Sequence, residues 1–310
     1  MLSDVAEPVG AHPWAKGERL LVEVHAAAVA FPDVLQSRGL YQHGADAPYI
    51  VGGEYAGIVL EAPAGSRFAP GDRVAGLSVW GSLAERVLAI PRHTVRIPES
   101  MGWAEGASFY LNYVTNLFTL HRAAFRDGES VLVHGAAGGL GTAALDLLRR
   151  RAEPVIAVVS SESKAAVATD CGAHAVVRSD EDWLTQVREL TGGHGIDVVI
   201  DPVGGDRFTD SLRALDVGGR LMVVGFAEGS IPEVKVNRLL LRDLSVVGVA
   251  LEPWWYERYP EYSEVLLDEM EALAATVSPH VGHRLAFDDA AEALGIIDRR
   301  EAMGKVVVEL

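Results

Sequence analysis

The residues whose types and spacing most clearly indicate chemistry lie in a glycine-rich stretch, residues 131–141 (VLVHGAAGGLG). The apolar run 131–133 predicts a buried strand, and residues 142–151 have the spacing of a helix. In a strand–turn–helix of this kind, backbone N–H groups at the helix start can bind the pyrophosphate of a dinucleotide, because small residues let it approach and the helix dipole favours its charge. The residues expected to lie against the phosphates are Ala136, Ala137, Gly138, Gly139, Leu140 and Gly141.

This motif departs from the usual dinucleotide fingerprint at one position. When the stretch is aligned with the pattern GxGxxG, the three glycine positions fall on Ala136, Gly138 and Gly141. On this motif alone, an ordinary turn between a strand and a helix in an apolar α/β protein therefore remains an alternative.

The elements around the turn favour nucleotide binding. From residue 131 to residue 249, predicted strands and helices alternate strictly, which is typical of a parallel sheet with helices on both faces. Before this region, short apolar runs separated by glycine and proline turns predict a small all-β, barrel-like unit. Its expected strands cover residues 20–29, 54–60, 73–77 and 81–90. Near Gly102, a candidate N-cap with Glu105 three residues on, the spacing becomes helical.

Length, composition and charge limit the possible functions. The chain has 310 residues and 49% of them are apolar, enough for two domains with sizeable cores. No transmembrane helix and no secretory signal are predicted. The formal net charge of −16 argues against nucleic acid and an anionic membrane as partners. Cys171 is the only cysteine, which excludes intrachain disulfides and predicts a cytoplasmic protein.

The residues after the second strand of the alternating region indicate which dinucleotide is bound. No carboxylate stands at the tip of the VIAVV strand, where an acidic residue would select NAD. Ser160, Ser161 and Lys164 follow instead, and two hydroxyls with a lysine suit a 2′-phosphate. Glu162 argues against this interpretation, and a solvated surface lysine is the alternative.

Five motifs occur together in a fixed order. They are FPDVLQSRGLY (31–41), PGDRV (70–74), GAAGGLG (135–141), DPVGGD (201–206) and GKVVV (304–308). Together they resemble the medium-chain dehydrogenase/reductase superfamily, in its zinc-free, zeta-crystallin-like quinone oxidoreductase branch. The resemblance implies an α/β protein with a GroES-like β-barrel catalytic domain from residues 1–105 and 250–310. It also implies a Rossmann domain, a doubly wound parallel sheet that binds NADPH, from residues 106–249.

The resemblance also assigns roles to individual residues. Tyr41, at the end of the RGLY run, corresponds to a tyrosine beside the nicotinamide, and a phenol there could donate a hydrogen bond to a developing oxyanion. Thr115 corresponds to a threonine near the same ring. Lys164 and Arg178 correspond to positions that face the 2′-phosphate and support NADPH as the cofactor. Further cofactor-binding positions are Val203, Gly225, Phe226, Asn237 and Lys305.

The positions of the family's catalytic zinc ligands are occupied by residues that cannot bind a metal. They fall on Ala30 and Gly53, and the structural-zinc cysteines are missing, so no metal is expected. His280 and His283 are interpreted as strand or turn residues. An alcohol needs a metal or a base to lose its proton, whereas a quinone or an enone accepts hydride directly and gives a stabilised anion.

These inferences lead to one main functional hypothesis and two alternatives. The main hypothesis is a zinc-independent oxidoreductase that transfers hydride from NADPH to a quinone, a small aromatic or conjugated carbonyl substrate. The alternatives are an enone or enoyl-thioester reductase of the same superfamily, and a non-catalytic NADPH-binding protein. The segment with Trp254, Trp255, Tyr256 and Tyr259 is either core or dimer packing, or an apolar wall for a flat substrate.

The last strand of the alternating region predicts the oligomeric state. The run from Leu244 to Val249 is apolar and has no charge or proline to protect a sheet edge. Pairing of this strand with its copy across a two-fold axis would bury the edge. A homodimer through this strand is therefore expected, as the family resemblance also implies.

Overall fold

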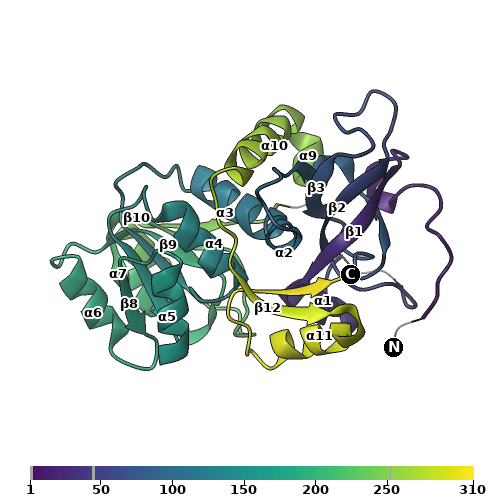
Figure 1. Ribbon diagram of the computed structural model, residues 1–310. Coiled ribbons are helices and arrows are strands. Elements are labelled where there is room, and N and C mark those ends of the chain that lie inside the picture. The colour runs from purple at the N-terminus through teal and green to yellow at the C-terminus, as the bar shows by residue number, and fades with distance from the viewer. Residues whose placement is uncertain (1–2, 44–45, 252) are drawn as a thin grey trace. The chain divides into compact units, whose positions relative to one another are not determined.

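The computed structural model describes residues 3–43, 46–251 and 253–310, with the side chains of residues 253–255 left out. The chain divides into two compact units, Met1–Val114 with Tyr256–Leu310, and Thr115–Trp255 (Figure 1). The first unit is therefore built from both ends of the chain, and the second is inserted between them. Helix α3 (Tyr110–Arg122) leads from one to the other.

The first unit is organised around strand β1 (Leu20–Val29), whose ten residues are mostly buried. One edge of β1 pairs with β2, and the other is shared by β4 and β13, all antiparallel. The seven-stranded sheet has the order β12-β13-β1-β2-β3-β5, with β4 paired to β1. The other strands are β2 (Glu54–Glu61), β3 (Arg73–Leu77), β4 (Arg86–Ala89), β5 (Thr94–Arg96), β12 (Val281–Ala286) and β13 (Lys305–Glu309).

The prediction of a strand over residues 81–90 is wrong in its first half, because only β4 (Arg86–Ala89) forms. Val79 and Gly81 have positive φ angles of 67° and 99°, which turn the chain away from an extended course. The N–H groups of Gly81 and Leu83 donate to the carbonyls of Ile50 and Val51 in a distant loop. The backbone of this segment therefore takes its partners from a loop rather than from a strand.

The helices of the first unit are short except for one. Gly102 is the N-cap of α2, as predicted, and the Glu105 carboxylate lies over it while pairing with Arg284. The α-helices are α1 (Phe31–Ser37), α2 (Trp103–Ala107), α9 (Pro253–Arg258), α10 (Pro260–Ala274) and α11 (Ala290–Asp298). The 3₁₀ helices are Pro13–Ala15, Pro91–His93 and Phe287–Asp289.

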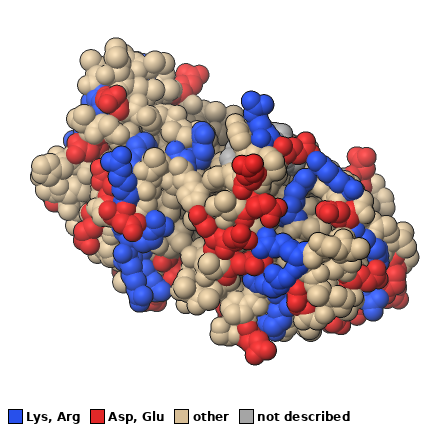
Figure 2. Space-filling view, turned by 90° about the horizontal axis from the view of Figure 1, so that it is seen from above, with Lys and Arg blue, Asp and Glu red and all other residues tan. Residues whose placement is uncertain are grey.

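Ion pairs of the first unit offset part of its acidic charge. Arg67 lies beside α10 and pairs with Asp268 at 3.0 Å and Glu271 at 3.2 Å. Glu271 also lies 3.6 Å from the Arg96 guanidinium. Seen from the side on which α10 lies, basic side chains are interspersed with acidic ones (Figure 2). Some of the acidic residues are therefore neutralised locally by arginines.

The second unit confirms the predicted alternation of strands and helices. Its sheet has six strands in the order β11-β10-β9-β6-β7-β8, and every pair is parallel. The strands are β6 (Val131–His134), β7 (Val155–Val159), β8 (Ala175–Arg178), β9 (Ile196–Asp201), β10 (Leu215–Val223) and β11 (Ser245–Gly248). The helices are α4 (Gly139–Leu148), α5 (Glu162–Asp170), α6 (Trp183–Leu190), α7 (Phe208–Ala214), α8 (Asn237–Leu240) and the 3₁₀ helix Gly205–Arg207.

Strand order reverses between β6 and β9 in this sheet. From β6 the chain proceeds outward to β7 and β8, and from β9 it proceeds the other way to β10 and β11. Right-handed crossovers then place α4 and α5 on one face and α6 and α7 on the other, so both faces are covered. The buried core accordingly contains Leu132, Ile156 and Val199 from the strands with Trp183 and Leu212 from the helices. In such a sheet, the point of reversal is where ligands bind.

Two further features of the chain are the character of its helices and its single cysteine. Within the described ranges, no helix is both long and apolar enough to cross a lipid bilayer. Cys171 follows helix α5 and is buried, and burial raises the pKa of its thiol to about 11. This thiol therefore stays protonated at neutral pH, whereas the thiolate is the reactive form.

Candidate cofactor and substrate sites

The glycine turn of the second unit begins where β6 ends, at His134. Gly138 is the N-cap of α4, and its φ of −82° and ψ of 174° are those of extended backbone. No side chain caps the helix. The first N–H groups of an α-helix have no partner inside it. Because two of the first three belong here to glycines, Gly139 and Gly141, and the helix is uncapped, these N–H groups form a cradle that fits a pyrophosphate.

The glycines of this turn serve two different purposes. A Cβ at Gly141 would lie 2.4 Å from the carbonyl oxygen of Gly135 and 2.5 Å from the Cα of Ala136, so glycine permits the close packing of helix and turn. A Cβ at Gly138 would meet only the Gly135 oxygen, at 3.4 Å, and otherwise open space. Gly138 therefore keeps clear the approach to the N–H groups. Ala136, which replaces the first glycine of the fingerprint, is fully buried and fits without a clash.

The loop after β9 lies directly against this turn. The Asp201 carboxylate accepts hydrogen bonds from the N–H groups of Val203 and Gly204, both at 2.9 Å. Val203 lies close enough that a Cβ on Gly135 would be 3.0 Å from its Cγ2. The structure thus brings the turn and Val203 together at the carboxyl ends of β6 and β9, where strand order reverses.

Gly225 and Phe226, two further predicted cofactor residues of the second unit, lie at the same edge of the sheet. Gly225 and Phe226 follow β10, and the next residue, Ala227, donates its N–H to the Pro202 carbonyl at 3.1 Å. Phe226 is 39% exposed. Asn237 is the first residue of α8, in the segment between β10 and β11, and is exposed.

Asn116, next to Thr115 on α3, supports the turn in a way that the sequence did not predict. Its amide donates to the Leu140 carbonyl at 2.9 Å, and the residue is 1% exposed. The adjacent backbone is fixed as well, because the Thr119 hydroxyl donates to the Thr115 carbonyl at 2.7 Å. No local pattern in the sequence connects Asn116 with the turn at Leu140.

A buried histidine at the end of β6 is a second residue that sequence reasoning did not single out. Burial lowers the pKa of His134 to about 4, so its imidazole is neutral at physiological pH. Its Nε2 lies 2.8 Å from the Ser211 hydroxyl on α7, and its ring stands edge-on to Trp183 at 5.2 Å. We assign His134 to the core beneath the turn.

The residues expected to bind the 2′-phosphate are brought together. Val159 at the end of β7 pairs in register with Arg178 at the end of β8. The Ser161 hydroxyl caps α5 by accepting the Lys164 N–H, and the Lys164 ammonium lies 3.3 Å from the Ser160 hydroxyl. One exposed corner of the sheet therefore carries two hydroxyls, one ammonium and one guanidinium.

The guanidinium of this corner already has anionic partners. Arg178 donates to both carboxylate oxygens of Asp180, at 3.0 and 2.5 Å, and lies 3.8 Å from Glu181. The hydrogen bonds and charge of Arg178 lower the pKa of Asp180, which stays ionised. The positive charge that Arg178 was expected to offer a phosphate is thus partly neutralised.

In the first unit, a buried charged cluster surrounds the positions of the family's zinc ligands. Asp33, Glu54 and Lys305 are 4%, 1% and 3% exposed. Asp33 accepts the N–H of Ala30 at 2.7 Å, and burial raises its pKa to about 7. Burial also raises the pKa of Glu54, and the Lys305 ammonium, which contacts it, opposes that rise. Lys305, predicted to bind the cofactor, is therefore engaged by Glu54.

Ala30 and Gly53 offer no ligand atoms beside this cluster. Ala30 is the N-cap of α1, and a Cβ on Gly53 would lie 3.5 Å from the Asp33 carboxylate. Throughout the part of the chain that the structure describes, no group of three or more His, Cys, Asp or Glu side chains could hold a metal ion. His283 lies in β12 and accepts the Met303 N–H at 3.3 Å, which confirms its interpretation as a strand residue.

Tyr41 belongs to an aromatic cluster that the sequence did not predict. Its ring stands edge-on to His43 at 5.8 Å, and His43 stands edge-on to Trp14 at 5.2 Å. Trp14 in turn contacts Trp80 at 5.7 Å, and Trp80 contacts His12 at 4.8 Å. We call His12, Trp14, Tyr41, His43 and Trp80 the Tyr41 cluster. All but His12 are half-buried, so aromatic surface around Tyr41 stays accessible.

The segment first considered as an aromatic wall is divided in the structure. Tyr256 is buried in the core of the first unit, with its ring 4.7 Å from that of His93. Tyr259 is 45% exposed. The side chains of Trp254 and Trp255 lie outside the described residues, so both interpretations of these two tryptophans stay predictions.

Known proteins are similar to this chain over nearly its whole length. Residues 16–99 match the model of an alcohol dehydrogenase GroES-like domain, and residues 139–271 match that of a zinc-binding dehydrogenase. Quinone oxidoreductase-like protein 2 of Bos taurus is 35% identical over 93% of this chain and 84% of its own. A probable oxidoreductase from Mycobacterium abscessus is 37% identical with a TM-score of 0.87, over 99% of this chain and 93% of its own. The quinone oxidoreductase from Thermus thermophilus, solved also in complex with NADPH, is 32% identical with a TM-score of 0.81, and the match covers 100% of this chain and 96% of that protein.

Proposed function

Because the chain belongs to the medium-chain dehydrogenase/reductase superfamily, among its quinone oxidoreductase-like members, we propose that it is an oxidoreductase that reduces quinones with NADPH. The observation that carries this proposal is the open cradle at the start of α4, at the point where strand order reverses. The name of the Thermus thermophilus protein, a quinone oxidoreductase solved with NADPH, supports both parts of it. The single cysteine supports a place in the cytoplasm.

The residues of the second unit would hold the cofactor by its phosphates. The N–H groups of Gly139, Leu140 and Gly141 bind the pyrophosphate, and Ser160, Ser161 and Lys164 bind the 2′-phosphate. Asn116 keeps the turn in place through the Leu140 carbonyl. When bound, NADPH supplies the hydride.

The residues of the first unit would select and orient the substrate. The phenol of Tyr41 donates a hydrogen bond to the substrate oxygen that gains negative charge. The rings of the Tyr41 cluster offer apolar faces and edges to a flat conjugated molecule. Ala30 and Gly53 provide no metal ligand with which to activate an alcohol. This combination favours a quinone over an alcohol as the substrate.

A stopped-flow experiment tests the proposal. NADPH oxidation is followed with a small quinone and, separately, with a conjugated enone and an enoyl thioester. We expect the quinone to be reduced fastest, with a deuterium isotope effect when the cofactor is deuterated at C4. Because the reduced quinone is a stabilised anion that water can protonate, Tyr41→Phe should lower kcat/KM by no more than about tenfold, or about 1.4 kcal/mol.

Three results would contradict the proposal in different ways. A thousandfold loss in Tyr41→Phe would mean that acid catalysis is obligatory and that the substrate is less activated than a quinone. Turnover of the enone or the thioester alone would identify a reductase of conjugated carbonyls. Tight NADPH binding without turnover of any acceptor would identify a non-catalytic NADPH-binding protein.

A further inference from the structure

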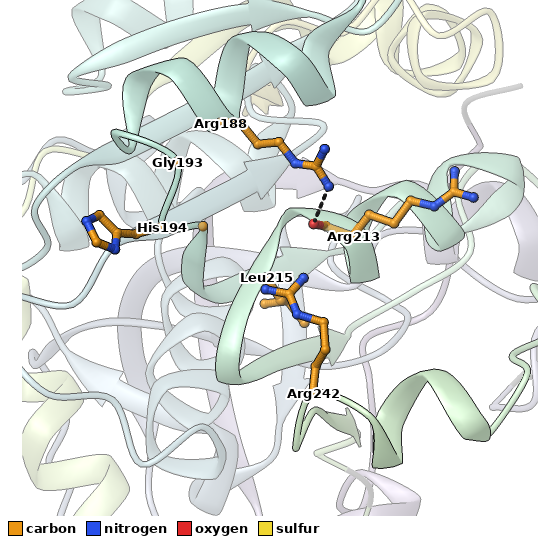
Figure 3. A pocket seen from close by; sticks show the side chains of 7 residues that line it. Arg188, Gly193, His194, Arg213, Leu215 and Arg242 are labelled. Atoms are coloured by element: carbon orange, nitrogen blue, oxygen red, sulfur yellow. Dashed lines mark hydrogen bonds between the residues drawn. The ribbon is translucent and has the colours of Figure 1, made fainter.

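At the edge of the second unit's sheet opposite the glycine turn, several segments line a half-open surface hollow of about 260 Å³ (Figure 3). Its walls include Arg188 from the last turn of α6, Arg213 from the last turn of α7, and Arg242 from the turn before β11. Leu215, the first residue of β10, is fully buried beneath them. Because the strands are parallel, this edge carries the amino ends of β9, β10 and β11, whereas the glycine turn follows a carboxyl end. The hollow is therefore separate from the cofactor cradle.

The arginines around the hollow are incompletely neutralised. Arg213 pairs with Asp210 at 2.7 Å, and Arg242 lies 4.0 Å from Asp216, at the outer limit of an ion pair. Arg188 donates to the Arg213 carbonyl at 3.3 Å and makes no ion pair with any residue that the structure describes. A guanidinium has five N–H donors, so most of those on Arg188 remain for a ligand. Positive charge is thus concentrated here in a chain whose net charge is −16.

Backbone packing brings these arginines together. The loop between α6 and β9 contains Gly193 and Gly195, with positive φ angles of 86° and 107°. A Cβ at Gly195 would lie 2.7 Å from the Asp216 nitrogen, so only glycine lets this loop lie against the end of α7. In Figure 3, Arg188 and Arg242 extend towards the hollow from opposite sides, while the imidazole of His194 points away. The guanidinium groups of Arg188 and Arg242 therefore both face the hollow.

We propose that this hollow is a binding site for a small phosphate-bearing anion, held between Arg188 and Arg242. Guanidinium groups match the oxygens of a phosphate and bind them through paired, charge-assisted hydrogen bonds. The volume of the hollow is below that of sites for drug-sized ligands, so it suits inorganic phosphate or a small phosphate monoester rather than a dinucleotide. The proposal does not depend on the proposed function.

Calorimetry on protein saturated with NADPH tests this site, because the cofactor's own phosphate positions are then filled. Inorganic phosphate and glycerol 3-phosphate are the two probes, at low ionic strength. We expect a Kd of about 1 mM or tighter for at least one of them. Tighter binding of inorganic phosphate would identify free phosphate as the ligand, tighter binding of glycerol 3-phosphate would identify a phosphate monoester, and equal affinities would mean that the site recognises the phosphate group alone. The Gly138→Val variant, whose cofactor cradle is blocked, allows the same titration without NADPH.

Substitutions of Arg188 and Arg242 test whether these two side chains bind the phosphate. Arg188→Gln and Arg242→Gln should each weaken phosphate binding by at least about tenfold, whereas Arg150→Gln, an exposed site at the same edge but outside the hollow, should leave it unchanged. Arg188→Gln also loses the hydrogen bond to the Arg213 carbonyl, which can affect folding, whereas Arg242→Gln loses no such bond and tests phosphate binding independently of it. No heat of binding with either probe, or equal affinities in Arg242→Gln and Arg150→Gln, would overturn the proposal.

Discussion

The ammonium of Lys305 and the carboxylate of Glu54 form a buried ion pair that connects β13 to β2 across the intervening strand β1. The two side chains are 3% and 2% exposed. The second oxygen of Glu54 accepts the N–H of Leu111 at 3.1 Å. The resemblance implied that Lys305 binds the cofactor, but the structure shows that this ammonium already holds two strands of the first unit together.

Removing the ammonium should destabilise the first unit strongly. In Lys305→Met the Glu54 carboxylate remains buried without a counter-charge, which costs about 3–5 kcal/mol of the free energy of unfolding. The double variant Lys305→Met with Glu54→Gln removes both charges and should recover most of that loss. Urea denaturation measures both variants. A loss of less than about 1 kcal/mol in Lys305→Met would show that the pair contributes no more than an exposed one.

Asp33 should make the stability of the protein depend on pH in an unusual direction. Its pKa is about 7 in the folded protein, against about 3.9 in an unfolded chain. Between these values the folded protein holds a proton that the unfolded chain has released, so the free energy of unfolding falls as the pH rises from about 4 to about 7. Asp33→Asn should therefore gain stability relative to the unmodified protein across this window, by up to about 4 kcal/mol.

The control for this measurement is Asp4→Asn, at an exposed site. Urea denaturation at a series of pH values should give parallel profiles for this control and the unmodified protein. If the Asp33→Asn profile is parallel to them as well, Asp33 does not carry the proton. Glu54 and Lys305, the charged groups nearest to Asp33, are unchanged in all three proteins.

The sequence predicted the elements of the second unit well because they are buried on both faces. Strand β7 (Val155–Val159) has the bounds of the predicted VIAVV strand, since it is an apolar run between turn residues. The first unit was harder to predict, as residues 81–90 show. Their apolar pattern fits a strand, but the hydrogen bonds of Gly81 go to a loop some 30 residues earlier, at Ile50. Local periodicity carries no information about such a distant partner.

In the candidate site, too, the sequence predicted which strand ends lie together but not how individual side chains pair. Neighbouring parallel strands end at the same edge, so the proximity of Ser160, Lys164 and Arg178 could be predicted from the alternation alone. The pairing of Arg178 with Asp180 could not, because it depends on side-chain conformations at an exposed loop. The Tyr41 cluster was missed for a related reason: His12, Tyr41 and Trp80 come from three separate segments, and no local pattern connects them.

Two glycines of the turn should respond to substitution in opposite ways. Gly138→Val should fold, because a Cβ at this position would meet only one backbone oxygen, at 3.4 Å, and the φ of −82° suits valine, but it should lose NADPH binding. Gly141→Ala should lose stability instead, because its Cβ would overlap the backbone of Gly135 and Ala136. Thermal denaturation and NADPH fluorescence titration separate the two effects. Normal cofactor affinity in folded Gly138→Val would mean that the pyrophosphate binds elsewhere.

Asp180 should weaken the binding of NADPH through its pair with Arg178. In Asp180→Asn the guanidinium loses its strongest anionic partner, so affinity for NADPH should rise by about three- to tenfold while affinity for NADH changes little. Lys164→Ala, in the same corner, should change NADPH affinity in the opposite direction. Titration of each variant with both cofactors measures the effect. Equal affinities for NADPH and NADH in the unmodified protein would show that this corner does not read the 2′-phosphate.

The last prediction is a homodimer through β11 (Ser245–Gly248), which is the edge strand of the second unit's sheet. The N–H of Val249 donates inward to Val223. Because backbone groups alternate along a strand, the N–H groups of Val246 and Gly248 point outward, available to a second copy. Just before the strand, Leu240 and Leu241 are 81% and 76% exposed. An unpaired edge beside exposed leucines is the pattern that a two-fold contact would cover.

A charge placed on this surface should therefore separate the subunits without unfolding them. Leu241→Lys replaces a side chain that is exposed in the single chain, so the fold should be kept while the dimer dissociation constant rises by at least about tenfold. Val265→Lys, 51% exposed on α10 of the first unit, is the matched control and should stay dimeric. Light scattering at micromolar concentration measures the molar mass of each protein. A monomeric mass for the unmodified protein, or an unchanged dimer in Leu241→Lys, would refute an interface at this edge.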